Sequence, residues 1–253
     1  MRMLQTPMLL LLAIIAAAAA CWLFVGGAGA SDWRTASREP VGLAPDPATT
    51  PEAVLQVYAA RAWGWRGYFG VHTWIAVKPA GARAYRVYEV IGWRLRSSDS
   101  AVAIQERAPD ARWYGSVPDL LAERRGTPVE ALIARIDAAA RAYPYPGQYS
   151  AWPGPNSNTF TAYLARAIPE LEIHLPPTAI GKDFLGDRYL ATAPSGRGFQ
   201  ISFYGVAGVL ASVVEGIEVN LLGLSFGVDP LVPAVKLPLI GRIGLPPRTG
   251  TTP

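Results

Sequence analysis

Apolar and polar residues alternate with a period of two along residues 71–77 and 85–93, and a Pro-Ala-Gly turn at 79–81 separates them. This period is typical of β-strands, whose successive side chains point to opposite faces. The two segments are predicted to form an antiparallel hairpin in which Glu89 lies nearly opposite His72. A register slip of one residue would undo that pairing. The side chains expected on this shared face are His72, Trp74 and Ala76 on the first strand, and Tyr85, Val87, Glu89 and Ile91 on the second.

Three other segments carry the features of helix starts. Residues 127–130, TPVE, form a capping-box pattern, which predicts a helix to about Arg141. Residues 50–52, TPE, place a cap, a proline and an acid in order, which predicts a helix to about Ala62. Residues 154–160, GPNSNTF, open an amphipathic helix that is expected to end before the next proline.

The C-terminal part of the chain alternates again. Phe199, Ile201 and Phe203 are separated by single polar residues, and Ile217, Val219 and Leu221 alternate with Glu218 and Asn220. This pattern predicts a β-hairpin or meander, with bulges where glycines interrupt it. Residues 231–253 are rich in proline and are predicted to be an extended tail.

The N-terminus carries an apolar segment. Residues 8–25 contain no Asp, Glu, Lys or Arg, and this length is just sufficient to span a bilayer core of about 30 Å. Small residues at 28–30 resemble a signal cleavage site, so a retained anchor and a cleaved signal are both open, and the length of the apolar run favours the anchor. The predicted parts are a membrane anchor or signal at 1–30, a linker at 31–50, a single α+β domain at 51–230 and the tail at 231–253.

This segment predicts a location outside the cytoplasm. The chain is expected at the bacterial inner membrane, held through residues 8–25 with its domain facing the periplasm, or in the periplasm if the signal is cleaved. The formal net charge is +4, but the arginines are scattered singly or in pairs, so nucleic-acid binding is rejected. Cys21 is the only cysteine, which rules out an intramolecular disulfide.

Cofactor and metal sites are not predicted. The glycines lack the context of a phosphate loop or of a dinucleotide-binding turn. Two histidines far apart, with no usable cysteine and no acidic cluster, fall short of the three or four ligands that zinc requires.

The candidate chemistry centres on Ser157, His72 and Glu89. A nucleophile needs a base within hydrogen-bond reach and a third group that orients the base, and these three residues have those properties. Ser157 is then the nucleophile, His72 the general base and Glu89 its orienting group. Ser157 at a helix start is also what an ordinary cap looks like, and the capping role is the favoured alternative, with Asn156 and Asn158 as equally good caps.

The neighbours of these residues complete the candidate site. Asn156, Asn158 and Thr159 are the expected oxyanion or binding residues, with backbone N–H groups near Asn158 as the oxyanion donors. A buried carboxylate at Glu89 would need a partner, because an unpaired buried charge is costly. His72, or an arginine such as Arg86 or Arg94, is expected to supply it.

Four segments carry a resemblance to a bacterial family of uncharacterised exported proteins, domain of unknown function 3750. They are VHTWIA at 71–76, YEVIGW at 88–93, GPNSNTF at 154–160 and EGIE at 215–218. More distantly, the order of His-bearing strand, polar strand residue and Asn-nucleophile helix start is similar to the circularly permuted papain-like group, which includes NlpC/P60 peptidases and lecithin retinol acyltransferases. The resemblance implies an α+β fold with the Ser157 helix packed on an antiparallel sheet. That group has cysteine where this chain has Ser157.

Two functions follow as expectations. The first is a membrane-tethered periplasmic domain whose papain-like cleft binds a cell-wall peptide, lipid or acyl group, as a serine-variant hydrolase or acyltransferase. The second is a non-catalytic structural or interaction module of the bacterial envelope. The sequence leaves the substrate and the oligomeric state open. Aromatic residues that would supply the binding face of the second function are Trp63, Trp65, Tyr68, Tyr143, Tyr145 and Trp152.

Overall fold

A computed structural model describes residues 32–247 of the chain. The predicted membrane segment at residues 8–25 lies outside them, and no helix within 32–247 is both long enough and apolar enough to cross a membrane. Contacts separate the chain into residues 1–36 and residues 37–253. Of the first part the structure describes 32–36, where the Asp32 carboxylate accepts the backbone N–H of Arg34 at 3.1 Å. All strands and helices named below belong to the second part.

The first sheet has five antiparallel strands in the order β4-β3-β2-β1-β5. The predicted hairpin is present as β2 and β3, with Ile75 opposite Tyr88 and Val77 opposite Arg86. The strands are β1 Val54–Arg61, β2 Val71–Lys78, β3 Arg86–Val90, β4 Val102–Glu106 and β5 Asp119–Arg125.

Residues 50–62 were expected to form a helix, and this is wrong, because they contain β1. Val54, Leu55, Val57 and Tyr58 are fully buried, so the strand is covered on both faces. A strand buried on both faces has a continuous apolar run without alternation, which periodicity does not separate from a buried helix. Pairing with β2 on one side and β5 on the other decides for the strand.

Two α-helices pack on one face of this sheet. The first, α2, spans Thr127–Arg141 as predicted, but its N-cap is Gly126 and no capping box forms. The Glu130 carboxylate instead accepts the backbone N–H of Ala80 at 3.0 Å. The second, α3, spans Ser157–Ala167 and does carry a capping box. In the described residues three short 3-10 helices lie in the connections: η2 Gly64–Tyr68, η3 Gly92–Arg96 and η4 Pro169–Leu171.

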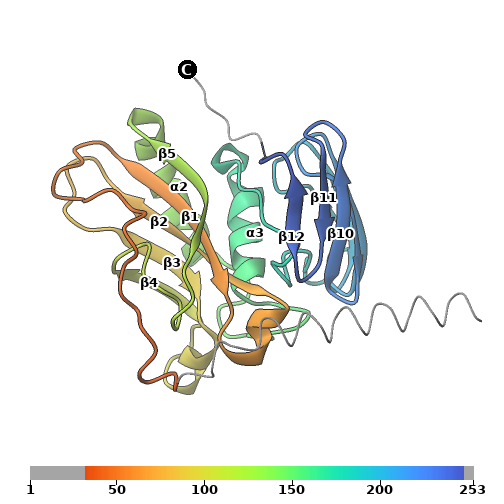
Figure 1. The fold of residues 1–253 in the computed structure, drawn as a ribbon, viewed down its shortest axis with the longest axis horizontal. Helices are drawn as coiled ribbons and strands as arrows, with labels where there is room; N and C mark the ends of the chain where they lie inside the picture. The colour runs from red at the N-terminus through yellow and green to blue at the C-terminus, as the bar shows by residue number, and fades with distance from the viewer. Residues whose placement is uncertain (1–31, 248–253) are drawn as a thin grey trace, which may run out of the picture. The chain divides into compact units, whose positions relative to one another are not determined.

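The larger apolar core lies between the first sheet and the two helices. Ile75 and Val77 of β2 meet Phe160 and Leu164 of α3 and Ile136 of α2, and all five side chains are buried. Figure 1 shows α3 between the first sheet and a second one. The α+β class is therefore confirmed, and α3 is held on its sheet by apolar burial along one stripe of the helix.

The second sheet has seven antiparallel strands in sequence order from β6 to β12. The predicted meander is present, but the pairs within β7 to β10 run without a register shift, so the expected bulges are absent from these strands. Glycines at the turns take positive φ, as at Gly205 (71°) and Gly223 (77°). The strands are β6 Leu190–Thr192, β7 Gly198–Phe203, β8 Ala207–Ser212, β9 Gly216–Leu221, β10 Leu224–Asp229, β11 Ala234–Leu237 and β12 Gly241–Gly244.

The extended tail predicted at residues 231–253 is corrected by β11 and β12. Val235 pairs with Val228 on one side and with Ile243 on the other, so the strands continue the sheet. Prolines 233 and 238 flank β11 rather than interrupt it, which a strand tolerates because only its interior residues need both backbone hydrogen bonds.

The second sheet has an unusual distribution of side chains. Its outward positions are apolar and exposed, and its inward positions are mostly polar and buried. A typical antiparallel sheet places its apolar face inward. We call the exposed set the apolar sheet face: it consists of Leu190, Phe199, Ile201, Phe203, Val209, Ile217, Val219, Leu221, Phe226, Val228, Val235 and Ile243.

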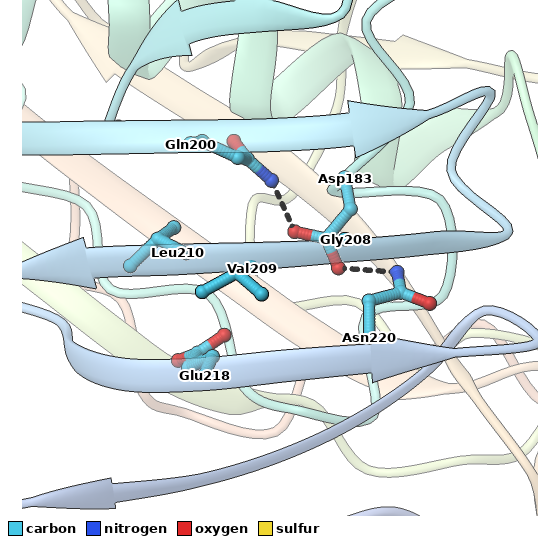
Figure 2. Close-up of a pocket in the computed structure, with 7 residues that line it drawn as sticks. All are labelled: Asp183, Gln200, Gly208, Val209, Leu210, Glu218 and Asn220. Atoms are coloured by element: carbon cyan, nitrogen blue, oxygen red, sulfur yellow. Dashed lines mark hydrogen bonds between the residues drawn. The ribbon is translucent and has the colours of Figure 1, made fainter.

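A buried hydrogen-bond network lies against the inward side of the second sheet. The Asp183 carboxylate accepts Gln200 Nε2 at 2.5 Å, Asn220 Nδ2 at 2.8 Å and Ser225 Oγ at 3.1 Å, as Figure 2 shows for the first two. Lys182 donates to Asp183 at 3.1 Å and to Glu218 at 2.5 Å. With these donors the Asp183 carboxylate is saturated, so the cluster holds the sheet in place rather than offering ligand sites.

Candidate functional site

The expected contact between His72 and Glu89 is present. His72 Nε2 lies 2.9 Å from Glu89 Oε2, and the exposed fractions of the two side chains are 7% and 1%. Both point to the same face of the first sheet, because β2 and β3 alternate as the sequence predicts. The hairpin therefore builds an enclosed imidazole–carboxylate pair.

The second oxygen of Glu89 is held by residues that the sequence did not single out. Arg107 donates to Glu89 Oε1 through Nε at 3.3 Å and through a terminal nitrogen at 3.2 Å, and Gln105 Nε2 donates at 3.2 Å. The arginines expected in this role make other contacts. Arg86 lies 3.8 Å from Asp137, and Arg94 donates to the Ser100 carbonyl. Gln105 could have been found from the alternation of β4, but Arg107 follows that strand and depends on the path of the loop.

Burial and charge fix the protonation of the pair. Burial lowers the pKa of His72 below its usual 6.5, and this effect outweighs the raising effect of Glu89. Burial alone would raise the pKa of Glu89, but the hydrogen bond from His72 and the charge of Arg107 lower it below its usual 4.5. At neutral pH the imidazole is therefore neutral and the carboxylate ionised. Since the carboxylate only accepts, His72 carries its proton on Nε2 and leaves Nδ1 as a base.

Aromatic rings enclose the imidazole. The His72 ring is stacked on Trp113, with centroids 3.6 Å apart and planes 11° apart, and Trp93 is also stacked on Trp113, with centroids 5.7 Å apart. The Arg107 guanidinium lies 5.2 Å above the ring of Trp74. These rings exclude water from the His72–Glu89 hydrogen bond, which strengthens it.

Asn156 organises the start of α3. Its Oδ1 accepts the backbone N–H groups of Asn158 at 2.9 Å and of Thr159 at 3.1 Å, and the Thr159 hydroxyl accepts the backbone N–H of Asn156 at 3.1 Å. Asn156 Nδ2 also donates to the carbonyls of Ala151 and Ile180. The cap is thus Asn156, and Ser157 is the first helical residue.

This arrangement corrects the expected oxyanion donors. The backbone N–H groups of Asn158 and Thr159 are already bonded to Asn156, so they do not point to an oxyanion. In the part of the chain that the structure describes, the backbone N–H of Ser157 has no acceptor. It is the donor that the helix start leaves available.

A hydrogen-bond network joins α3 to the beginning of β2. The Thr73 hydroxyl lies 3.0 Å from Asn158 Oδ1, 2.9 Å from the Thr161 hydroxyl and 3.4 Å from the Ser157 carbonyl. Asn158 Nδ2 donates to the Val71 carbonyl at 2.9 Å. The structure therefore brings Ser157 beside the residue that follows His72. Because successive strand residues point to opposite faces, Thr73 faces α3 while His72 lies with Trp74 and Trp113.

Several largely buried side chains of the described residues carry a polar atom that has no hydrogen-bond partner there. Among residues 32–247, the fully enclosed side-chain polar atoms that lack a partner are Tyr143 Oη and Arg166 Nε. Ser157 Oγ and His72 Nδ1 also make no hydrogen bond within the described residues, and they are not in that enclosed set. Both atoms are thus reached by solvent although their residues are largely buried.

The described residues hold no group of three or more His, Cys, Asp and Glu side chains suited to a metal ion. His174, the other histidine, is half-buried beyond η4 and belongs to none of the strands of the described residues. Burial lowers its pKa below the usual 6.5.

Comparison with known proteins gives one family. The family model described as "Protein of unknown function (DUF3750)" matches residues 52–184, which is more than half of the chain. The chain belongs to this family. The DUF3750 match contains His72, Glu89 and Ser157 and ends just after Asp183, so that β6 to β12 follow it. No curated protein and no solved structure matches the chain.

Proposed function

We propose that this protein is a serine-dependent hydrolase or acyltransferase with a permuted papain-like arrangement. Its substrate class is an amide or ester bond of a cell-envelope peptide or acyl group. The buried His72–Glu89 pair carries the proposal, because a neutral imidazole whose Nε2–H is held by a carboxylate is oriented as a general base through Nδ1.

The chemistry proceeds by acyl transfer through Ser157. His72 Nδ1 takes the hydroxyl proton as Ser157 Oγ forms a bond to the carbonyl carbon, and the backbone N–H of Ser157 donates to the resulting oxyanion. The imidazolium then gives its proton to the leaving amine or alcohol as that bond breaks. Water, or an acceptor alcohol, attacks the acyl-enzyme with the same base and restores Ser157. Glu89 stabilises the imidazolium in both steps.

A serine at this position needs the base more than a cysteine would. A thiol of pKa about 8.5 is converted to its anion by a helix N-terminus and a histidine, whereas a serine hydroxyl has no accessible anion. In the described residues His72 and Ser157 make no hydrogen bond to each other, and His72 lies on the face of β2 opposite to Thr73, which bonds α3. The proposed contact has to form at the start of β2. The ladder between β2 and β3 runs from Ile75 to Val77, and the first turn of α3 bonds to Val71 and Thr73 beyond it. The proposal requires Nδ1 and Oγ to approach within about 2.6–3.2 Å in the substrate complex.

Location follows from the sequence. We propose that residues 8–25 hold the chain at the bacterial inner membrane, with the domain in the periplasm, or direct it there before cleavage. Peptides and acyl groups of the envelope are then the amide and ester bonds within reach.

A covalent serine probe tests the proposal. The purified full chain, incubated with a fluorophosphonate, should be labelled at Ser157 as identified by peptide mass spectrometry. Ser157→Ala should abolish labelling, while Ser97→Ala, at an exposed serine distant in sequence, should leave it unchanged. His72→Asn should slow labelling by about 10²–10⁴-fold, the usual contribution of a general base. A folded wild-type chain that is not labelled at Ser157 would overturn the proposal.

A second candidate function is a non-catalytic interaction module of the bacterial envelope. Exposed aromatic side chains favour it, with Trp65 at 64% and Trp152 at 51% exposed. Tyr143, expected on this binding surface, is instead buried at 3% and belongs to the core. The same labelling experiment separates the two functions, because an interaction module binds its partner with Ser157 unreactive.

A further inference from the structure

The apolar sheet face is a surface of the described residues that the proposed activity does not use. Its cross-strand rows are continuous: Ile201 lies opposite Val209, Val209 opposite Val219, and Val219 opposite Phe226. Seven strands spaced about 4.8 Å apart, most of them near six residues long, give a face of about 500 Å². Soluble monomers rarely expose contiguous apolar patches beyond a few hundred Å², and such patches mark protein or membrane contacts.

The orientation of the second sheet is fixed by its inward side. Glu218 on β9 binds Lys182 at 2.5 Å and also binds Lys236 on β11, and both lysines are buried. Asp229 on β10 accepts Arg242 of β12 at 3.0 Å. Turning the sheet over would separate Glu218 from Lys182 and would leave the Asp183 carboxylate without its donors on the sheet, so the apolar positions face outward by construction.

We propose that the apolar sheet face docks on a lipid bilayer, with its side chains among the headgroups and the beginning of the acyl chains. This inference goes beyond the proposed activity and does not depend on it. Interfacial protein segments insert their apolar side chains about 5–10 Å into this region. The sheet keeps its own backbone hydrogen bonds in that position, since every outward side chain stands on a paired strand.

The composition of the face favours lipid over a second protein. Apart from Thr192, the outward strand positions from β6 to β12 carry only hydrocarbon side chains or glycine. Protein interfaces typically carry about one hydrogen bond per 100–200 Å² and a polar rim. Here the turns continue the apolar surface, with Val213, Leu222 and Ile240 all more than 60% exposed. A surface that offers almost no side-chain donor or acceptor and lacks a polar boundary at these turns matches hydrocarbon.

The edge beside β6 and β7 has the aromatic residues that suit a membrane boundary. Tyr189 and Tyr204 are half exposed, and their hydroxyls lie 3.1 Å apart. The ring of Tyr189 also packs on Phe203 of the apolar face, with centroids 5.5 Å apart. Tyrosine is enriched where one end of the side chain is in hydrocarbon and the other in water.

The chain outside the structure supplies a reason for a bilayer to be near. Residues 8–25 are charge-free and long enough to enter one. Residues 37–53 are held on the domain, for example by the bridge between Pro40 and Ala111. Residues 26–36 thus remain between the apolar segment and the domain, and a chain of that length reaches at most about 40 Å. A domain tethered by such a segment meets the bilayer at high effective concentration, so weak docking of the sheet is sufficient.

Site-specific fluorescence in the full chain tests this inference. Cys21→Ala removes the native thiol, and Val219→Cys on the apolar face then carries a single environment-sensitive fluorophore. Ala134→Cys, on the exposed side of α2, is the matched control. The proteins are reconstituted in vesicles of phosphatidylethanolamine and phosphatidylglycerol, with or without acyl-chain-brominated lipid as a contact quencher. We expect a several-fold brighter emission at position 219 and loss of most of it with brominated lipid, with neither change at position 134.

Two outcomes would overturn the inference, and they differ. Emission at position 219 like that at position 134 would mean that the face stays in water. Bright emission without quenching by brominated lipid, together with disulfide formation between unlabelled Val219→Cys chains, would mean that a second copy covers the face. Neither reading depends on Ser157, so failure here and failure of serine labelling are distinguishable. Ile201→Glu should abolish the quenching at position 219 while leaving the far-ultraviolet circular dichroism unchanged, because a charge in the row opposes lipid contact.

Discussion

The imidazole of His72 lies flat on the indole of Trp113, with ring centroids 3.6 Å apart and planes 11° apart. Trp113 belongs to a short turn closed by an isolated bridge to Ser116, so a loop residue covers a strand residue. The stack places an apolar plane over the ring that the proposed chemistry uses as a base. Burial is also the largest cause of the lowered pKa of His72.

Removing this cover should raise the pKa of His72. Trp113→Ala exposes the imidazole to water, which stabilises its charged form, so the titration should move up toward the usual 6.5. The measurement is the pH dependence of the His72 ring-proton signals by nuclear magnetic resonance. Trp65→Ala, at an exposed tryptophan, is the control and should leave His72 unmoved. An unchanged His72 titration in Trp113→Ala would contradict the burial argument.

Folding stability should fall on acidification below pH 6.5. The pKa of His72 is lower in the folded chain than its usual 6.5, so below that pH the unfolded chain binds more protons and gains stability relative to the folded one. Glu89, with its pKa lowered from 4.5, adds a further loss below pH 4.5. If a pKa is lower by one in the folded chain than in the unfolded chain, full protonation of the group lowers the free energy of unfolding by about 1.4 kcal/mol.

Urea unfolding midpoints across pH 7.5 to 4 check this dependence. His174 also has a lowered pKa and contributes with the same sign, so His72→Asn and His174→Asn are compared. His72→Asn should flatten the fall between pH 6.5 and 4.5 more than His174→Asn does. It should also reduce the loss below pH 4.5, because the hydrogen bond from His72 is the largest cause that lowers the pKa of Glu89. If His72→Asn keeps the full slope between pH 6.5 and 4.5, the proton uptake occurs elsewhere.

The hydroxyl of Tyr143 offers a stabilising substitution. It is fully enclosed without a hydrogen-bond partner among the described residues, while the ring packs edge-on against Phe160 with centroids 5.1 Å apart. Tyr143→Phe removes the unsatisfied oxygen and keeps the ring, so the free energy of unfolding should rise by about 1 kcal/mol. Tyr163→Phe is the matched control, because that hydroxyl donates to the Ala142 carbonyl at 3.3 Å, and its loss should lower stability by about 0.5 kcal/mol. The measurement is the denaturant midpoint of each variant. A lower midpoint for Tyr143→Phe than for the wild type would mean that the Tyr143 hydroxyl does make a stabilising hydrogen bond.

Local patterns in the sequence were sufficient for the elements around the candidate site. The period of two placed His72 and Glu89 on one face of a hairpin, and their side chains are in contact. The motif around Asn156 predicted the start of α3, because a cap acts within one turn of the chain. These features depend on residues close in sequence, or on the two strands of one hairpin, and that is why periodicity and caps reveal them.

Other features depend on which distant segments meet. β1 is a strand because β2 and β5 cover both its sides, and Arg107 and Trp113 reach the His72–Glu89 pair only through the path of a loop. Asn158 and Thr159 do not supply the expected oxyanion donors for a similar reason, because their backbone N–H groups bind the side chain of Asn156. The sequence did not reveal these hydrogen bonds. Whether a backbone N–H group is free to bind a substrate depends on which acceptors of the fold lie beside it.

The second sheet shows most clearly what the sequence pattern determines and what the tertiary contacts determine. Alternation along β7 and β9 by itself determined that apolar residues share one face and polar residues the other. Only the tertiary structure decided which face points outward, because Lys182 and Asp183, which lie outside the sheet, bind Glu218 and Gln200 on its polar side. A period of two defines two faces without a direction, and the direction comes from the free energy of pairing buried charges with partners that lie far away in the sequence.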